Sequence, residues 1–139
     1  MKKEFVVDNS VVMSWLFEDE STEYTESILS AKEDFAAHVP AIWPLEVVNV
    51  LASAERRRRV TGSDSMRFLT LLESLPISVS LDSEKCGMRV LLPLCRDFGL
   101  TSYDASYLLL AMSLGIPIAT VDKALTAAAK KAGLKIFLR

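Results

Sequence analysis

The sequence has 139 residues, of which 50% are hydrophobic and 24% are charged. This composition is typical of one globular domain and excludes a chain that is disordered throughout. The formal net charge of −2 excludes a broadly basic surface, so any positive potential that attracts nucleic acid has to be local or come from a bound cation.

The expected elements alternate between short apolar strands and helices. In chain order they are a strand at 5–7, a short helix ending near 17, an acidic turn at 18–20, a helix at 23–36, a strand at 38–41, helices at 44–59 and 64–75, a strand at 77–81, helices at 83–98 and 101–115, a strand at 116–121, a helix at 122–132 and a strand at 135–138. Pro93 predicts a kink or a break inside its helix. The alternation predicts a single α/β domain over residues 1–139, with three α/β/α layers and a short, mainly parallel central sheet flanked by helices.

Two further features bear on the location of the chain. The uncharged run Ala105–Val121 is shorter than the roughly 20 residues of a membrane span, and Gly115 and Pro117 interrupt it. Cys86 and Cys95 would lie on opposite faces of one helix, which disfavours a disulfide or a thiolate metal site. We therefore expect reduced cysteines, a cytoplasmic protein and no membrane association.

Four acidic residues stand at the starts of expected helices: Asp8, Glu46, Asp104 and Asp122. Each has a structural explanation taken alone. Asp8 and Asp122 could cap the helices that follow them, and Glu46 would favour the helix dipole in a first turn. Thr101 and Asp104 have nearly the spacing of a capping box.

Taken together, the four acids predict a metal site. Asp8 and Asp122 follow strands, and ligands of parallel sheets bind beyond the carboxyl ends of the strands. Short loops could bring Glu46 and Asp104 to the same edge. Carboxylates held close together in apolar surroundings raise one another's pKa, and a hard cation such as Mg²⁺ or Mn²⁺ relieves their repulsion.

Four segments, in order along the whole chain, are Val7-Asp8-Asn9-Ser10, Pro44-Leu45-Glu46-Val47-Val48-Asn49-Val50-Leu51, Asp104-Ala105-Ser106-Tyr107-Leu108-Leu109-Leu110-Ala111 and Thr120-Val121-Asp122-Lys123-Ala124-Leu125. In this order and spacing they resemble the PIN domain family, and in particular the VapC-type toxins of bacterial and archaeal toxin–antitoxin pairs. The resemblance implies a PIN fold, endonuclease activity on RNA, one or two Mg²⁺ or Mn²⁺ ions, a homodimer and neutralisation by a small antitoxin protein.

The resemblance also implies roles for individual residues. Asp8 and Asp104 would bind the metal directly, and Glu46 and Asp122 would complete the catalytic site, partly through bound waters. Either Glu46 or Asp122 could accept a proton from the attacking water. Supporting polar groups that orient the acids or the substrate would be Ser10, Asn49 and Thr120.

The run Arg56-Arg57-Arg58-Arg59 is the strongest cationic feature of the sequence. It could bind an RNA backbone, or it could only complement the dipole at a helix C-terminus. Two other functions remain open. Asp8 could be the nucleophile of a phosphatase, although Ser10 occupies the place where such enzymes of the haloacid-dehalogenase type have a second acid. The domain could also bind RNA or protein without catalysis.

Overall fold

The computed structural model describes residues 1–81 and 87–139. Its elements, in chain order, are β1 (Lys3–Val7), α1 (Asn9–Ser14), a 3₁₀ turn (Glu18–Glu20), α2 (Glu23–Ser30), a second 3₁₀ turn (Lys32–Asp34), β2 (Phe35–Val39), α3 (Trp43–Arg56), α4 (Gly62–Ser74), β3 (Ile77–Val79), α5 (Gly87–Phe98), α6 (Ser102–Leu114), β4 (Ile118–Ala119) and α7 (Lys123–Lys131). The predicted alternation of strands and helices is confirmed.

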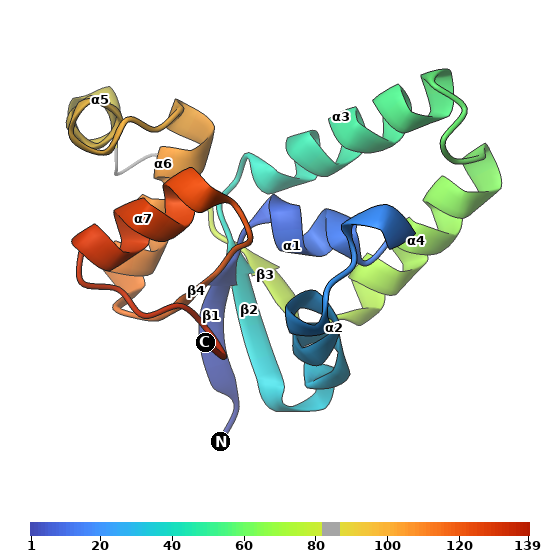
Figure 1. Ribbon diagram of the computed structural model, residues 1–139, viewed down its shortest axis with the longest axis horizontal. Coiled ribbons are helices and arrows are strands. Elements are labelled where there is room, and N and C mark those ends of the chain that lie inside the picture. The colour runs from blue at the N-terminus through green and yellow to red at the C-terminus, as the bar shows by residue number, and fades with distance from the viewer. Residues whose placement is uncertain (82–86) are drawn as a thin grey trace.

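The strands form one four-stranded, all-parallel sheet in the order β3-β2-β1-β4. In Figure 1, α5, α6 and α7 lie on one side of the sheet and α1 to α4 lie on the other. The predicted three-layer α/β/α architecture is therefore confirmed. The carboxyl-terminal part of β1 is covered on both faces, so Phe5, Val6 and Val7 are fully buried and form the apolar run typical of buried parallel strands, whereas Lys3 and Glu4 at its start are exposed.

The strand order places a topological switch point between β1 and β4. From β1 the chain moves outward through β2 to β3, and it then returns to the other side of β1 to form β4. The connections that leave β1 and β4 run to opposite faces of the sheet, which opens a crevice at their carboxyl ends. Asp8 follows β1 directly, and Asp122 follows β4 after two residues.

Two predicted boundaries around β2 are wrong. The helix expected at 23–36 ends at Ser30, and the strand expected at 38–41 begins at Phe35. Phe35, Ala37 and Val39 are buried at alternate positions, and their backbone pairs with β1 and β3. This pairing with distant segments competes successfully with the helical tendency of the local sequence.

The C-terminal part of the sheet is shorter than predicted. The strand expected at 116–121 is reduced to Ile118–Ala119, and the segment expected as a last strand makes one parallel bridge, between Ile136 and Ile118. Leu138 has a φ of 59°, in the left-handed region, which is incompatible with a continuing strand.

Helix α5 runs from Gly87 to Phe98 with Pro93 inside it, so the helix is not broken there, and the kink at Pro93 stays a prediction. The predicted start of this helix at Ser83, and Cys86, lie outside the described residues, so the pairing of the cysteines stays a prediction. Among the residues that the structure describes, no helix has both the length and the apolar character needed to cross a membrane.

Candidate active site

Asp8 lies at the centre of a hydrogen-bond network that joins the ends of β1 and β4. Its side chain does not cap α1. Instead, Oδ2 accepts hydrogen bonds from the hydroxyls of Ser10 at 2.6 Å and Thr120 at 2.9 Å. These hydroxyls in turn accept from the backbone N–H groups of Val121 at 3.2 Å and Asp122 at 3.0 Å. Both side-chain bonds reach the same oxygen, so neither hydroxyl occupies Oδ1.

Glu46 and Asp122 are each held through one carboxylate oxygen. Glu46 lies in the first turn of α3, where Oε1 accepts a hydrogen bond of 2.7 Å from the hydroxyl of Tyr107. Asp122 caps α7, and its Oδ2 accepts from the N–H of Leu125 at 2.8 Å. Capping is thus one role of Asp122, and it leaves the second oxygen of this carboxylate for other partners.

Asp104 lies in the first turn of α6. The hydroxyl of Thr101 accepts a hydrogen bond of 3.1 Å from the Asp104 N–H. The reciprocal bond of a full capping box, from the Thr101 N–H to the Asp104 carboxylate, is not formed. Asp104 therefore has the position of a capping residue while its carboxylate takes no part in the cap.

All four acids line one pocket of about 290 Å³, at the switch point of the sheet. Its lining residues are Asp8, Asn9, Ser10, Met13, Phe17, Glu20, Glu46, Val50, Arg59, Asp104 and Asp122. We call this site the acid pocket. Residues that are far apart in sequence meet here because the parallel sheet gathers the carboxyl ends of its strands at one edge.

The electrostatics of the acid pocket favour protonation or a bound cation. Burial raises the pKa of Asp8 and of Glu46, although hydrogen bonds from Ser10, Thr120 and Tyr107 partly oppose this. Burial, followed by the charges of the other three acids, raises the pKa of Asp104 from its ordinary 3.8 to about 6. The negative charges of the carboxylates therefore repel one another, as expected for like charges in a partly buried cluster.

A family model described as the PIN domain matches residues 5–131. The chain belongs to the PIN domain family. PIN domains are generally nucleases, and they typically use divalent metal ions. The structure is similar to the crystal structure of PAE2754 from Pyrobaculum aerophilum, with a TM-score of 0.69 and 25% sequence identity, over 92% of this chain and 86% of that chain. A comparison with curated proteins gave no significant match.

The donor atoms of this PIN domain suit a hard divalent cation. The acid pocket offers oxygen atoms, and Asn9 Oδ1 is a buried acceptor without a hydrogen-bond partner among the described residues. Within residues 1–81 and 87–139, however, no three His, Cys, Asp or Glu side chains are arranged to hold an ion as they stand.

Sequence reasoning missed two polar residues that line this PIN domain's acid pocket, Asn9 and Glu20, and the tyrosine that holds Glu46. Tyr107 is fully buried and fixes Glu46. Its position, one helical turn after Asp104, was a usable signal, because a buried tyrosine hydroxyl needs a partner. Asn9 and Glu20 gave no comparable signal. Asn9 is the first residue of a short helix, where asparagine is common, and Glu20 belongs to an acidic turn of the kind that usually faces solvent.

The predicted supporting and cationic residues separate into two groups. Ser10 and Thr120 contact Asp8, whereas Asn49 lies outside the acid pocket and lines a neighbouring one. Of the four arginines at 56–59, only Arg59 lines the acid pocket. Arg57 lines the neighbouring pocket with Asn49.

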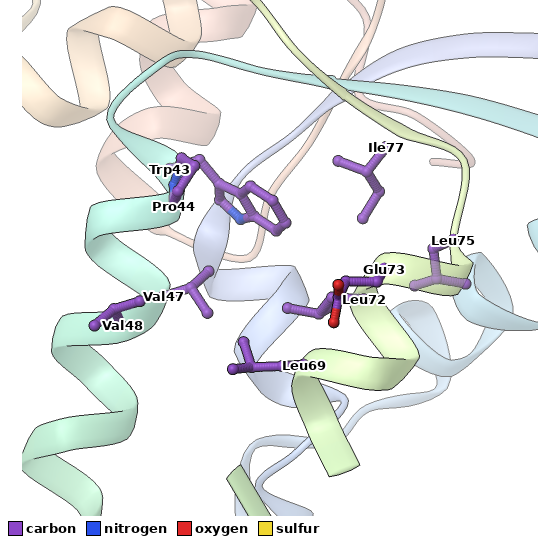
Figure 2. A pocket seen from close by; sticks show the side chains of 9 residues that line it. All are labelled: Trp43, Pro44, Val47, Val48, Leu69, Leu72, Glu73, Leu75 and Ile77. Atoms are coloured by element: carbon purple, nitrogen blue, oxygen red, sulfur yellow. The ribbon is translucent and has the colours of Figure 1, made fainter. Parts of the chain in front are cut away.

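An apolar pocket of about 430 Å³ lies elsewhere, between α3 and α4. Figure 2 shows the side chains that line it, which are Trp43, Pro44, Val47, Val48, Leu69, Leu72, Glu73, Leu75 and Ile77. Glu73 is the one acid among them, so this pocket lacks a second carboxylate that could share an ion. We therefore place the candidate active site in the acid pocket.

Proposed function

We propose that the protein is a metal-dependent endoribonuclease that hydrolyses RNA phosphodiester bonds. The observation that supports this best is the convergence of Asp8, Glu46, Asp104 and Asp122 on one pocket at the switch point of the sheet. The raised pKa values of Asp8, Glu46 and Asp104 favour protonation or a bound cation, and a metal-dependent nuclease binds such a cation at its active site.

In this proposal Asp8 and Asp104 bind Mg²⁺ or Mn²⁺ directly, and Glu46 and Asp122 complete the site through waters. The bound cation would lower the pKa of a water and neutralise charge on the phosphate. Ser10 and Thr120 orient Asp8 by holding Oδ2. Tyr107 holds Oε1 of Glu46, so Oε2 would be the oxygen of Glu46 that could accept a proton from the attacking water, with Asp122 as the alternative acceptor.

The experiment is cleavage of structured RNAs in the presence of Mg²⁺, Mn²⁺ or EDTA. We expect cutting that requires metal and that falls at least a hundredfold in D8N and in D104N, because each substitution removes a direct ligand. D64N is the matched control, since Asp64 follows a threonine at the same spacing as Asp104 but lies outside the acid pocket. We expect D64N to cut as the wild type does.

Three results would contradict the proposal. The first is cutting that persists in EDTA or in both ligand variants. The second is release of phosphate from small phosphomonoesters without RNA cleavage, which would favour the phosphatase alternative. The third is an intact metal site without any cleavage, which would favour an RNA- or protein-binding module.

We further propose that this nuclease is the toxin of a VapBC-type pair, with a small antitoxin and a homodimeric state. Exposed apolar side chains on the adjacent helices α5 and α6, among them Leu92 and Leu114, support an interface with a second copy. Expression of the wild type should arrest growth, and D104N should not. Sedimentation should give a dimer that L92E and L114E weaken; a monomeric wild type would contradict the dimer.

A further inference from the structure

Arg59 differs from the other arginines of its run because the chain folds it back against the acid pocket. Arg58 has a φ of 58°, in the left-handed region, and the Arg59 N–H donates to the Ala54 carbonyl at 2.8 Å. This turn closes α3 and reverses the chain. The Arg59 guanidinium then lies over Phe17, with Cζ 4.1 Å from the ring centroid.

The acidic turn Glu18–Glu20 holds Arg59 through a single nitrogen. Nη2 donates to the two carboxylate oxygens of Asp19 at 3.1 and 3.3 Å and lies 3.7 Å from Glu20 Oε2. Arg59 and Asp19 side chains are 42% and 74% exposed, so the pair is weak. A guanidinium has five N–H donors in a planar fork, and these contacts leave the donors of Nη1 and Nε for an oxyanion.

A second pocket of about 260 Å³ continues from Arg59 along α3. We call it the α3 groove; its lining residues are Phe17, Asn49, Val50, Ser53, Ala54, Arg57 and Arg59. The two pockets adjoin, because three of these residues (Phe17, Val50 and Arg59) also line the acid pocket.

One face of α3 links the acids to the groove. Asn49, Ser53 and Arg57 recur every four residues and therefore share this face. Glu46, three residues before Asn49, lies on the same side. The face extends about 16 Å from Glu46 to Arg57, at 1.5 Å of rise per residue. Along this face the side chains change from the carboxylate of Glu46 to the neutral hydrogen-bonding groups of Asn49 and Ser53, and then to the cation of Arg57.

These groups suit one strand of nucleic acid bound through its phosphates. Arg57 and Arg59 provide a local positive charge at the groove, which the net charge of −2 does not supply. Phe17 is 6% exposed and lies beneath Arg59, and no other aromatic ring lines either pocket in the part of the chain that the structure describes. Bases therefore have no ring to stack on, and phosphate contacts read no sequence.

We propose that the α3 groove binds the RNA strand that leads away from the acid pocket, with Arg59 on the phosphate nearest the acids and Arg57 on one farther along. Recognition at this end of the site is independent of sequence. The choice of RNA as ligand rests on the proposed nuclease function, whereas the binding of a single strand by these two arginines does not require cleavage.

The test measures binding of a fluorescein-labelled oligouridylate by anisotropy, in EDTA, with D104N as the background so that no strand is cut. R59Q and R56Q remove the same charge from the same run, and Arg56 lines neither pocket. We expect R59Q to bind about tenfold more weakly at low salt. Its plot of log affinity against log salt should be shallower by about 0.7, the value for one phosphate contact on a single strand, and R56Q should keep the parent slope.

Two more variants separate binding from a structural role. R59K keeps the charge and should keep the slope, and R57Q should lose about as much slope as R59Q. Equal salt slopes for R59Q and R56Q would overturn the role of Arg59 in binding. The same conclusion would hold if R59Q had a lower melting temperature but an unchanged slope, because Arg59 would then have only a structural role. If R59Q fails to fold, an R57Q slope equal to that of R56Q overturns the groove. A wild type that cuts no RNA, with these slopes as expected, contradicts the nuclease function and supports the groove.

Discussion

At the scale of single residues, Asp64 and Asp104 share a local sequence and differ in environment. Thr61 and Asp64 form a complete capping box, in which each side chain accepts a hydrogen bond from the other's backbone N–H. The bond from the Thr61 N–H, with the help of Arg67, lowers the pKa of Asp64. Thr101 and Asp104 form only half of the box, and burial beside three other carboxylates raises the pKa of Asp104 to about 6.

The metal-free protein should therefore lose stability as the pH rises from about 4 to about 6. Folded Asp104 retains its proton in that range while the unfolded chain has released it, so ionisation favours unfolding. D104N removes this loss, and its free energy of unfolding in EDTA at neutral pH should exceed that of the wild type. We expect a gain on the order of 1 kcal/mol, since the half-exposed group is screened by solvent. Urea denaturation across this pH range measures it.

D64N is the control for this measurement and should change stability in the opposite direction. Asp64 has a lowered pKa, so its contribution is present above its unfolded pKa and is lost as the pH falls through the folded one. Removal of its charge should lower the melting temperature at neutral pH. A D104N protein that is less stable than the wild type in EDTA would count against a cluster of repelling carboxylates.

At the scale of elements, the end of α3 decides which arginine reaches the site. The helix ends at Arg56, and Arg58 adopts the left-handed conformation that glycine usually supplies at this place. An ordinary side chain in this conformation is strained by about 1 kcal/mol. The turn still forms, and the contacts of Arg59 with Phe17 and Asp19 lie directly beyond it.

R58G should raise the free energy of unfolding by about 1 kcal/mol, because glycine adopts a positive φ without strain. R56G removes the same charge from a residue of the helix and should lower the free energy of unfolding by about 0.5 kcal/mol. Urea denaturation of both variants beside the wild type gives the comparison. If R58G is destabilised as much as R56G, the left-handed turn is not a source of strain.

The helices and strands themselves were largely predictable. Apolar periodicity, Pro44 and Gly115 placed most of them within a few residues. The misplaced end of α2 and start of β2 share one cause: Phe35 and Ala36 gain their backbone partners from a strand that lies far away in sequence. A local pattern contains no information about such a partner.

At the scale of the whole molecule, the order β3-β2-β1-β4 creates the site. It sets β1 beside β4, so Asp8 and Thr120 are hydrogen-bonded although they are 112 positions apart. Helices α3 and α6 then add Glu46 and Asp104 from opposite sides of the sheet. The acid pocket therefore depends on the entire fold, and a ligand that binds it should stabilise the entire fold.

Mn²⁺ should accordingly raise the melting temperature of the wild type. A ligand that binds only the folded state contributes about 2.7 kcal/mol at a concentration one hundred times its Kd. The shift should largely disappear in D8N and persist in D64N, whose changed carboxylate lies outside the acid pocket. Thermal melts with and without Mn²⁺ test this without any activity measurement. Equal shifts in all three proteins would place the cation elsewhere.

The sequence by itself determined the alternation of helices and strands, the helix starts and the four acids at the ends of strands and helices. These features depend on hydrogen bonds and side-chain periodicity within a few residues, which the sequence contains directly. Only the tertiary structure decided that the four acids line one pocket, that Tyr107 holds Glu46, and that Arg59 alone of its run lines the acid pocket. Each of these depends on contact between segments far apart in the chain, and such contacts exist only once the sheet has brought those segments together.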